Sequence, residues 1–244
     1  MRYLIPVLAL LALSCRGGEE KAASEATSTG TAGGTEEPSA APVFNLRDSL
    51  LRPEDVPPEL IPVDGSPPLS EPQLLTAEEF FAGQLAAGQI TADDVGEWGV
   101  AGAAAQSYTA PFGISGPGVE FLQVTVLLHE GTDGARSLFA FPKTVPDRSS
   151  VEALEAGPGR VVVLYEEVAA PAIGDESRLI HFVSENQNEP GRVESFMIVM
   201  RRDRVVAMMQ VRDEEGVITA DDVRSIAMKL DDRIVDGLKG TRGP

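Results

Sequence analysis

The feature that most constrains the fold is a pair of strand-like segments separated by two residues. Arg192 to Arg201 and Arg204 to Arg212 are rich in residues that favour strands, and Arg202-Asp203 lies between them. Alternate positions of the second segment are apolar and are expected to face a core: Val205, Ala207, Met209 and Val211. Strands joined by so short a turn pair antiparallel, so the sequence predicts an antiparallel sheet.

Further segments have strand-like composition and are bounded by turn-forming residues. They are Gly99 to Ala110, Val119 to His129, Val161 to Val168 and Arg178 to Ser184. Strands that follow one another with short connections favour antiparallel neighbours. Together with the hairpin, these segments predict an antiparallel sheet of about five strands.

A recurring phrase marks three helix starts. In Leu75-Thr-Ala-Glu-Glu-Phe80, Ile90-Thr-Ala-Asp-Asp-Val95 and Ile218-Thr-Ala-Asp-Asp-Val223, the threonine is an N-cap and an acid three residues later completes a capping box. An internal repeat or an acidic metal site is the alternative, but the flanking residues do not match. The helices are predicted over Ala77 to Ala87, Ala92 to Trp98 and Ala220 to Asp236, with shorter ones at Asp133 to Phe141 and Ser149 to Glu152.

The last of these helices has a single apolar stripe and is expected to end at Gly237. The stripe consists of Val223, Ile226, Ala227, Leu230 and Ile234. A helix with one apolar face packs against a sheet, so we expect an α+β fold with the helices packed on one face. The domain is expected to span 44–240, and its Pro-rich extended beginning, 44–73, to contain a one-turn helix that Pro57 ends.

The first fifteen residues have the pattern of an export signal. Arg2 precedes an apolar run, Leu4 to Leu13, that is about half the length needed to span a bilayer. Its end, Leu11-Ala-Leu-Ser-Cys15, resembles the lipobox of bacterial lipoproteins, in which the cysteine is diacylated and becomes the new N-terminus. Cys15 is the only cysteine of the chain and stands where the lipid acceptor is required. A cleaved secretory signal and a short uncleaved anchor are the alternatives.

The lipobox resemblance implies a lipoprotein, with acyl chains such as palmitate, anchored in the bacterial cell envelope outside the cytoplasm. Residues 16–43 are rich in Gly, Ser, Thr, Ala and Glu, a composition that predicts a disordered linker. The net charge of −18 disfavours nucleic acid as a partner. The expected partners are therefore the membrane, which the anchor would enter, and an unknown small apolar ligand or envelope protein. We expect the domain itself to be monomeric.

Candidate residues for catalysis are few. His129 and His181 are the only histidines, and with Glu166 or Glu167 they could serve a hydrolase or a metal-dependent enzyme. The spacing fits no recurring metal motif, however, and the chain has no G-x-S-x-G, P-loop or G-x-G-x-x-G sequence. We therefore expect no catalytic residues, no metal and no cofactor.

Methionines are concentrated in the last third of the chain. They fill irregular cores in most proteins, but they also line adaptable apolar grooves that take lipids or peptides. Met208 and Met209 are adjacent, so in a strand they face opposite ways, and one of them points away from the helix-covered side. The candidate ligand-binding residues are Met197, Met208, Met209, Met228 and Tyr108.

Two motifs carry a family resemblance. Ile173-Gly-Asp-Glu-Ser177, followed by a strand, and the hairpin Val199-Met-Arg-Arg-Asp-Arg-Val-Val206 resemble sensor-like extracytoplasmic domains of bacterial lipoproteins and mycobacterial receptor kinases. The resemblance covers Trp98 to Val235 and implies that an antiparallel sheet and helices frame a ligand-binding cleft. This chain lacks the disulfides of the kinase domains. From the residues alone, Gly174-Asp-Glu is a turn that caps or salt-bridges the nearby arginines.

These observations predict a non-enzymatic, lipid-anchored extracytoplasmic domain that binds a ligand or senses it. Two other classes stay open from the sequence. One is an envelope hydrolase or metal-dependent enzyme, and the other is a structural or docking lipoprotein, which would present an exposed apolar patch without a cavity.

Overall fold

The computed structural model describes residues 44–62, 72–110, 119–141, 144–154, 160–170, 172–187, 191–213 and 217–239. The predicted signal segment, Cys15 and the predicted linker 16–43 lie outside these ranges. Within them, no helix has both the length and the apolarity needed to cross a bilayer.

The described chain forms eight strands and five helices. The strands are β1 (Ile61–Pro62), β2 (Gln73–Leu75), β3 (Val100–Thr109), β4 (Phe121–His129), β5 (Arg160–Val168), β6 (Glu176–Asn186), β7 (Arg192–Arg202) and β8 (Val205–Asp213). The helices are α1 (Ala77–Ala86), α2 (Ala92–Trp98), α3 (Thr132–Ala140), α4 (Arg148–Leu154) and α5 (Ala220–Lys239). The fold class is therefore α+β, as the sequence predicts.

All the strands belong to one antiparallel sheet, in the order β1-β3-β4-β8-β7-β6-β5, and β2 also pairs with β3. The estimate of about five strands is too low. The two strands that no predicted segment covers, β1 and β2, have only two and three residues, too few for an alternating pattern to be visible. The expected one-turn helix near Pro57 is instead a series of turns, in which the Asp55 N–H donates to the Arg52 carbonyl at 2.9 Å.

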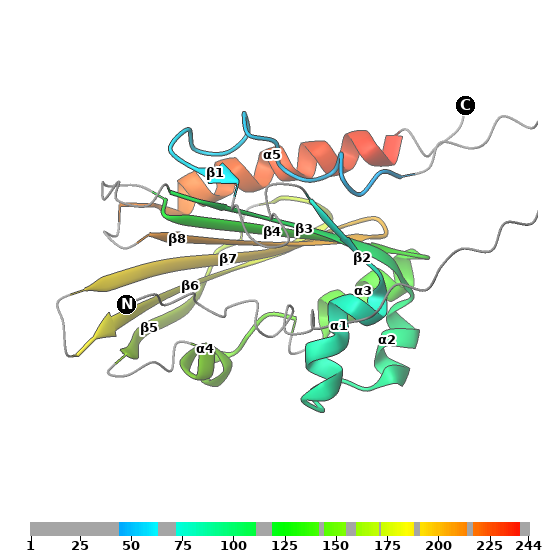
Figure 1. Ribbon diagram of the computed structural model, residues 1–244, viewed down its shortest axis with the longest axis horizontal. Helices are drawn as coiled ribbons and strands as arrows, with labels where there is room; N and C mark the ends of the chain where they lie inside the picture. Colours follow the sequence, from blue (N-terminus) through cyan, green and yellow to red (C-terminus); the bar gives the residue numbers. More distant parts are fainter. Residues whose placement is uncertain are drawn as a thin grey trace, which may run out of the picture.

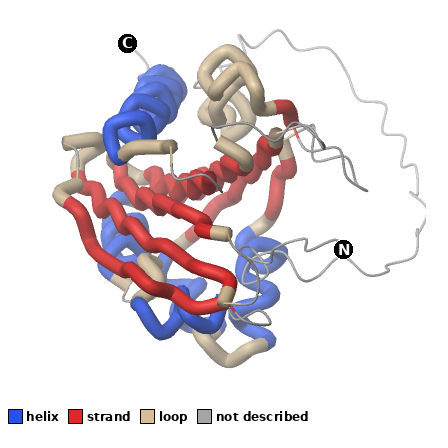
Figure 2. Tube along the Cα trace, turned by 90° about the vertical axis from the view of Figure 1, so that its left-hand side faces the viewer, coloured by secondary structure: helices blue, strands red, loops and turns tan. Residues whose placement is uncertain are grey.

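Helices cover both faces of the sheet, so the prediction that they pack on one face is wrong. Figure 1 shows α5 on one side and α1 to α4 on the other, and Figure 2 shows the same two layers after a quarter turn. We call the α5 side the outer face and the opposite side the inner face. Each face has its own apolar cluster: Leu230 packs into the outer one, and Leu138 of α3 into the inner one.

The end of α5 also differs from the prediction. The helix does not stop at Gly237 but continues to Lys239. Phe44 explains why a glycine is present there, because a Cβ atom at Gly237 would lie 2.9 Å from the Phe44 Cε2 atom. Gly237 thus allows the start of the domain to approach the last turn of α5 closely, and it does not end the helix as the sequence predicted.

Candidate functional site

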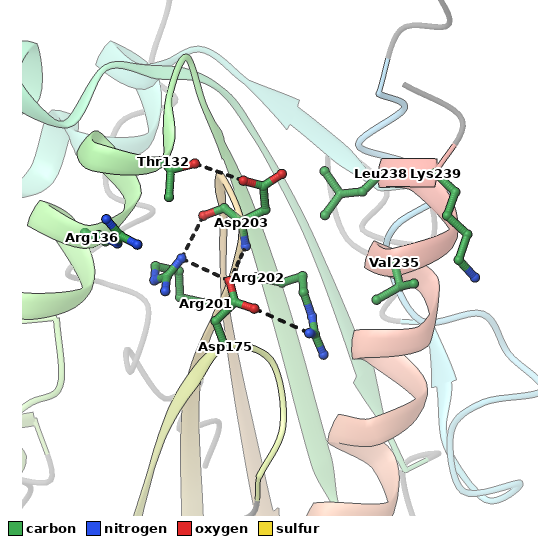
Figure 3. Close-up of a pocket in the computed structure, with 9 residues that line it drawn as sticks. All are labelled: Thr132, Arg136, Asp175, Arg201, Arg202, Asp203, Val235, Leu238 and Lys239. Carbon is green, nitrogen blue, oxygen red and sulfur yellow. Dashed lines mark hydrogen bonds and ion pairs between the residues drawn. The ribbon is translucent and has the colours of Figure 1, made fainter. Parts of the chain in front are cut away.

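A charged pocket lies between the β7–β8 turn and the second half of α5 (Figure 3). Its volume is about 450 Å³, within the range of small-molecule sites. Its walls combine both signs of charge with a few apolar side chains: Thr132, Arg136, Asp175, Arg201, Arg202, Asp203, Val235, Leu238 and Lys239.

Backbone geometry brings the charged groups of this pocket together. Asp203, at the tip of the β7–β8 turn, has a φ of 53°, and Gly174 has a φ of 69°. A side chain at Gly174 would place its Cβ 2.4 Å from the Arg201 carbonyl oxygen, so only glycine permits this approach. As a result, Asp175 lies directly against the turn and accepts hydrogen bonds from the Asp203 N–H at 2.8 Å and Arg201 Nη1 at 3.1 Å.

The arginines of the pocket are already paired with acids of the same domain. Arg201 is buried and donates to Glu176 at 2.6 Å as well as to Asp175. Arg202 donates to Asp231 of α5, and this hydrogen bond raises the pKa of Arg202. The expectation that Gly174-Asp-Glu salt-bridges the arginines is therefore confirmed.

The charges of the pocket mainly hold the domain together. The Thr132 hydroxyl at the start of α3 donates to Asp203 at 2.9 Å, and Asp231 of α5 accepts from Arg202. The β7–β8 turn is thus bonded to a helix on each face of the sheet. Because Arg201, Arg202, Asp175 and Asp203 already have partners inside the domain, a ligand entering here would have to compete with them.

A second candidate site lies on the inner face of the sheet, where polar side chains interrupt the apolar core. Gln210 pairs in register with Gln123 on one side and Met197 on the other. Side chains two residues apart in a strand share a face, so Met208 of the inner cluster places Gln210 on the inner face as well. We call the following set the inner polar surface: Gln123, Ser195, Met197, Met208, Gln210 and Arg212.

Two oxygen atoms of the inner polar surface are buried without a hydrogen-bond partner. They are Ser195 Oγ and Gln210 Oε1, and their residues are only 1% and 4% exposed. A buried polar group without a partner costs about 1–3 kcal/mol of stability. Met197 and Met208 beside them are only partly buried. The inner polar surface therefore combines apolar contact area with polar atoms that lack partners.

The structure distributes the five predicted ligand-binding residues over separate places. Met197 and Met208 are on the inner face, whereas Met209 is buried in the outer core. Met209 and Met208 do face opposite ways, as their adjacency requires. Met228 lies on α5 and is 57% exposed. The Tyr108 hydroxyl is fully buried and donates to the Leu51 carbonyl at 2.8 Å.

The residues proposed for an enzyme are also not gathered at one site. His129 is buried, its Nδ1 atom lies 2.7 Å from the Trp98 carbonyl oxygen, and burial lowers its pKa. Glu167 pairs with Arg178, which lowers the pKa of Glu167. Glu166 does contact His181, at 3.0 Å. No group of three or more His, Cys, Asp or Glu side chains in the described ranges has the geometry of a metal site.

Sequence reasoning did not single out Ser195 and Gln210. The only sign in the sequence was that each polar residue is followed directly by an apolar one, as in Ser195-Phe196 and Gln210-Val211. Alternation alone assigns such a residue to the solvent side. In this sheet both faces are covered, so the side that alternation assigns to solvent is an interior.

The comparisons with known proteins identify no family. No protein-family model matches the chain, and no curated protein matches it. Among solved structures, it is similar to the extracellular domain of PknH from Mycobacterium tuberculosis, with 13% identity and a TM-score of 0.46 over 78% of this chain and 95% of that one. An uncharacterised protein from Mycobacterium smegmatis matches with 12% identity and a TM-score of 0.36 over 84% and 100%.

Proposed function

We propose that this protein is a non-enzymatic, lipid-anchored extracytoplasmic domain that binds a ligand at the inner polar surface. The lipobox sequence ending in Cys15 supports the location. The observation that carries the binding role is the pair of buried oxygens, Ser195 Oγ and Gln210 Oε1, which lack partners beside two partly exposed methionines.

The chemistry of the inner polar surface specifies the class of ligand. Both oxygens are uncharged acceptors, so the ligand supplies hydrogen-bond donors such as hydroxyl or amide groups. The thioether side chains of Met197 and Met208 favour an adaptable apolar contact. The ligand that matches these two oxygens and two methionines is an uncharged molecule with an apolar part and a donor-bearing head, which the net charge of −18 does not repel.

The inner polar surface supports binding better than the charged pocket does, because it contains buried polar atoms without hydrogen-bond partners. Arg201, Arg202, Asp175 and Asp203 of the pocket are bonded to one another or to Asp231. At the inner polar surface, by contrast, a ligand would remove the cost of about 1–3 kcal/mol for each oxygen without a partner. A ligand gains most where it completes hydrogen bonds that the protein leaves open.

A binding experiment tests this proposal. The probe is 1-monodecanoylglycerol, an uncharged amphiphile with two hydroxyls, and its binding is followed by displacement of Nile red fluorescence. The double substitution Met197→Ala with Met208→Ala removes apolar contact area worth about 2 kcal/mol, so the affinity should fall by at least about tenfold. The matched control is Met228→Ala, on the exposed side of α5, which should bind as the wild type does. Equal affinities of all three proteins would refute the proposal.

A further inference from the structure

A cluster of one histidine and two carboxylates lies apart from both candidate sites. His181 of β6 stands between two carboxylates of the neighbouring strands, Glu166 of β5 and Glu194 of β7. Its Nδ1 atom is 3.0 Å from Glu166 and its Nε2 atom is 2.8 Å from Glu194. The ring also stacks on Phe196, with centroids 4.4 Å apart and planes 8° from parallel. The imidazole is therefore fixed in orientation, and both of its nitrogens face carboxylates.

The two contacts need two donated protons. A neutral imidazole carries one N–H and presents a lone pair at its other nitrogen, whereas a carboxylate can only accept. With neutral His181, one of the two contacts would set a lone pair against a negatively charged oxygen. Both hydrogen bonds can therefore form only when the cluster binds one additional proton, beyond the one carried by a neutral histidine.

The exposed fractions of the side chains determine which of the two hydrogen bonds breaks when that proton is lost. The side chains of His181 and Glu194 are each 12% exposed, whereas that of Glu166 is 49% exposed. Glu194 has little room to move, but Glu166 can turn into water. Since Glu166 belongs to β5, the last strand at its edge of the sheet, loss of the proton would release a side-chain bond that holds this edge strand.

Other charged groups near the cluster on the described chain do not supply a competing donor to Glu166. On β7, Arg192 Nη2 is 3.9 Å from Glu194. On β8, Asp213 pairs in register with Glu194 and accepts the Ile218 N–H at 2.8 Å. Both groups lie near Glu194, on the side of the ring away from Glu166. The side-chain hydrogen bond of Glu166 is therefore the one to His181 Nδ1.

We propose that Glu166, His181 and Glu194 form a proton-operated latch that holds the edge strand β5 in acid and loosens it as the pH rises. The direction of the pH dependence follows from the number of protons that each state binds. The latched state binds one proton more than the released state, so protons favour it. Such a latch would let the pH outside the cytoplasm set the mobility of β5, independently of whether the inner polar surface binds a ligand.

The test is amide hydrogen exchange of β5 at pH 5 and pH 8, corrected for the intrinsic exchange rate. In the wild type, β5 amides bonded to β6 should be more protected at pH 5, roughly fivefold to tenfold, as expected for one partly exposed charge-assisted hydrogen bond. The decisive variant is Glu166→Gln. Its amide can donate to the lone pair of neutral His181 while Nε2–H donates to Glu194, so protection should be retained at both pH values.

A neighbouring residue supplies the matched control. Glu167 is on the same strand but pairs with Arg178, so Glu167→Gln should keep the pH dependence of the wild type. His181→Ala should lose the extra protection at pH 5. Equal wild-type protection at the two pH values would overturn the latch, and so would a Glu166→Gln variant that keeps the wild-type pH dependence.

Discussion

At the scale of single residues, Tyr108 shows how a side chain that suggested a ligand contact is used in the core. Its ring is fully buried, and its hydroxyl bonds the Leu51 carbonyl, which ties β3 to the segment that leads into the domain. Burial, with help from the negative charges of Asp55 and Glu54, raises the pKa of Tyr108 to about 12. The aromatic residue was visible in the sequence, but its partner, 57 residues away, was not.

The raised pKa of Tyr108 predicts alkaline destabilisation. Because the folded state holds this proton more tightly than the unfolded state, whose tyrosine titrates near pH 10, stability is fully present below pH 10 and is lost as the pH rises towards 12. Tyr108→Phe should lose about 1 kcal/mol at pH 7 with the hydrogen bond, and should show a smaller decline between pH 9 and pH 11. Urea unfolding across this range measures both effects. A decline as steep as that of the wild type would contradict the assignment to Tyr108.

At the scale of elements, the sequence predicts most accurately those features that depend on interactions between residues close together in the chain. The three capping boxes are confirmed: Thr76, Thr91 and Thr219 each bond the acid three residues later. The long strands and the helices agree with the predicted ranges to within a few residues. These features depend on contacts within a few residues, so the sequence itself contains their cause.

The same reasoning could not assign the helices to two faces of the sheet. The short helices bury few residues each; α3, for example, buries only Ala135 and Leu138. Their packing partners on the inner face are brought in by strands far away in the sequence. The inner polar surface was missed for the same reason, because Ser195 and Gln210 are buried by tertiary packing that no local pattern specifies.

At the scale of the whole molecule, the sequence predicts an anchor and a tether, and we propose that the domain they carry binds a ligand. The anchor is predicted from Leu11-Ala-Leu-Ser-Cys15. A cysteine that carries two or three acyl chains is held stably in a membrane, whereas a single chain gives marginal binding. The tether would then place the domain in the aqueous space next to the membrane.

Cys15→Ser tests this arrangement directly. The variant should not incorporate radiolabelled palmitate and should leave the membrane fraction, because serine provides no thioether for the diacylglyceryl group. The wild type, expressed in parallel, is the control. Unchanged labelling of the variant would refute the lipobox interpretation and leave the two alternatives, a cleaved secretory signal or an uncleaved anchor.

We propose that Gln210 is kept for binding at the expense of stability, and the substitution Gln210→Leu tests this proposal. The measurement is urea unfolding of the unliganded domain beside the affinity for 1-monodecanoylglycerol. We predict that the variant is more stable by about 1 kcal/mol, since an acceptor without a partner is replaced by an apolar group of similar size, and that its affinity is lower by about tenfold. A variant that is less stable and binds as tightly as the wild type would contradict the claim.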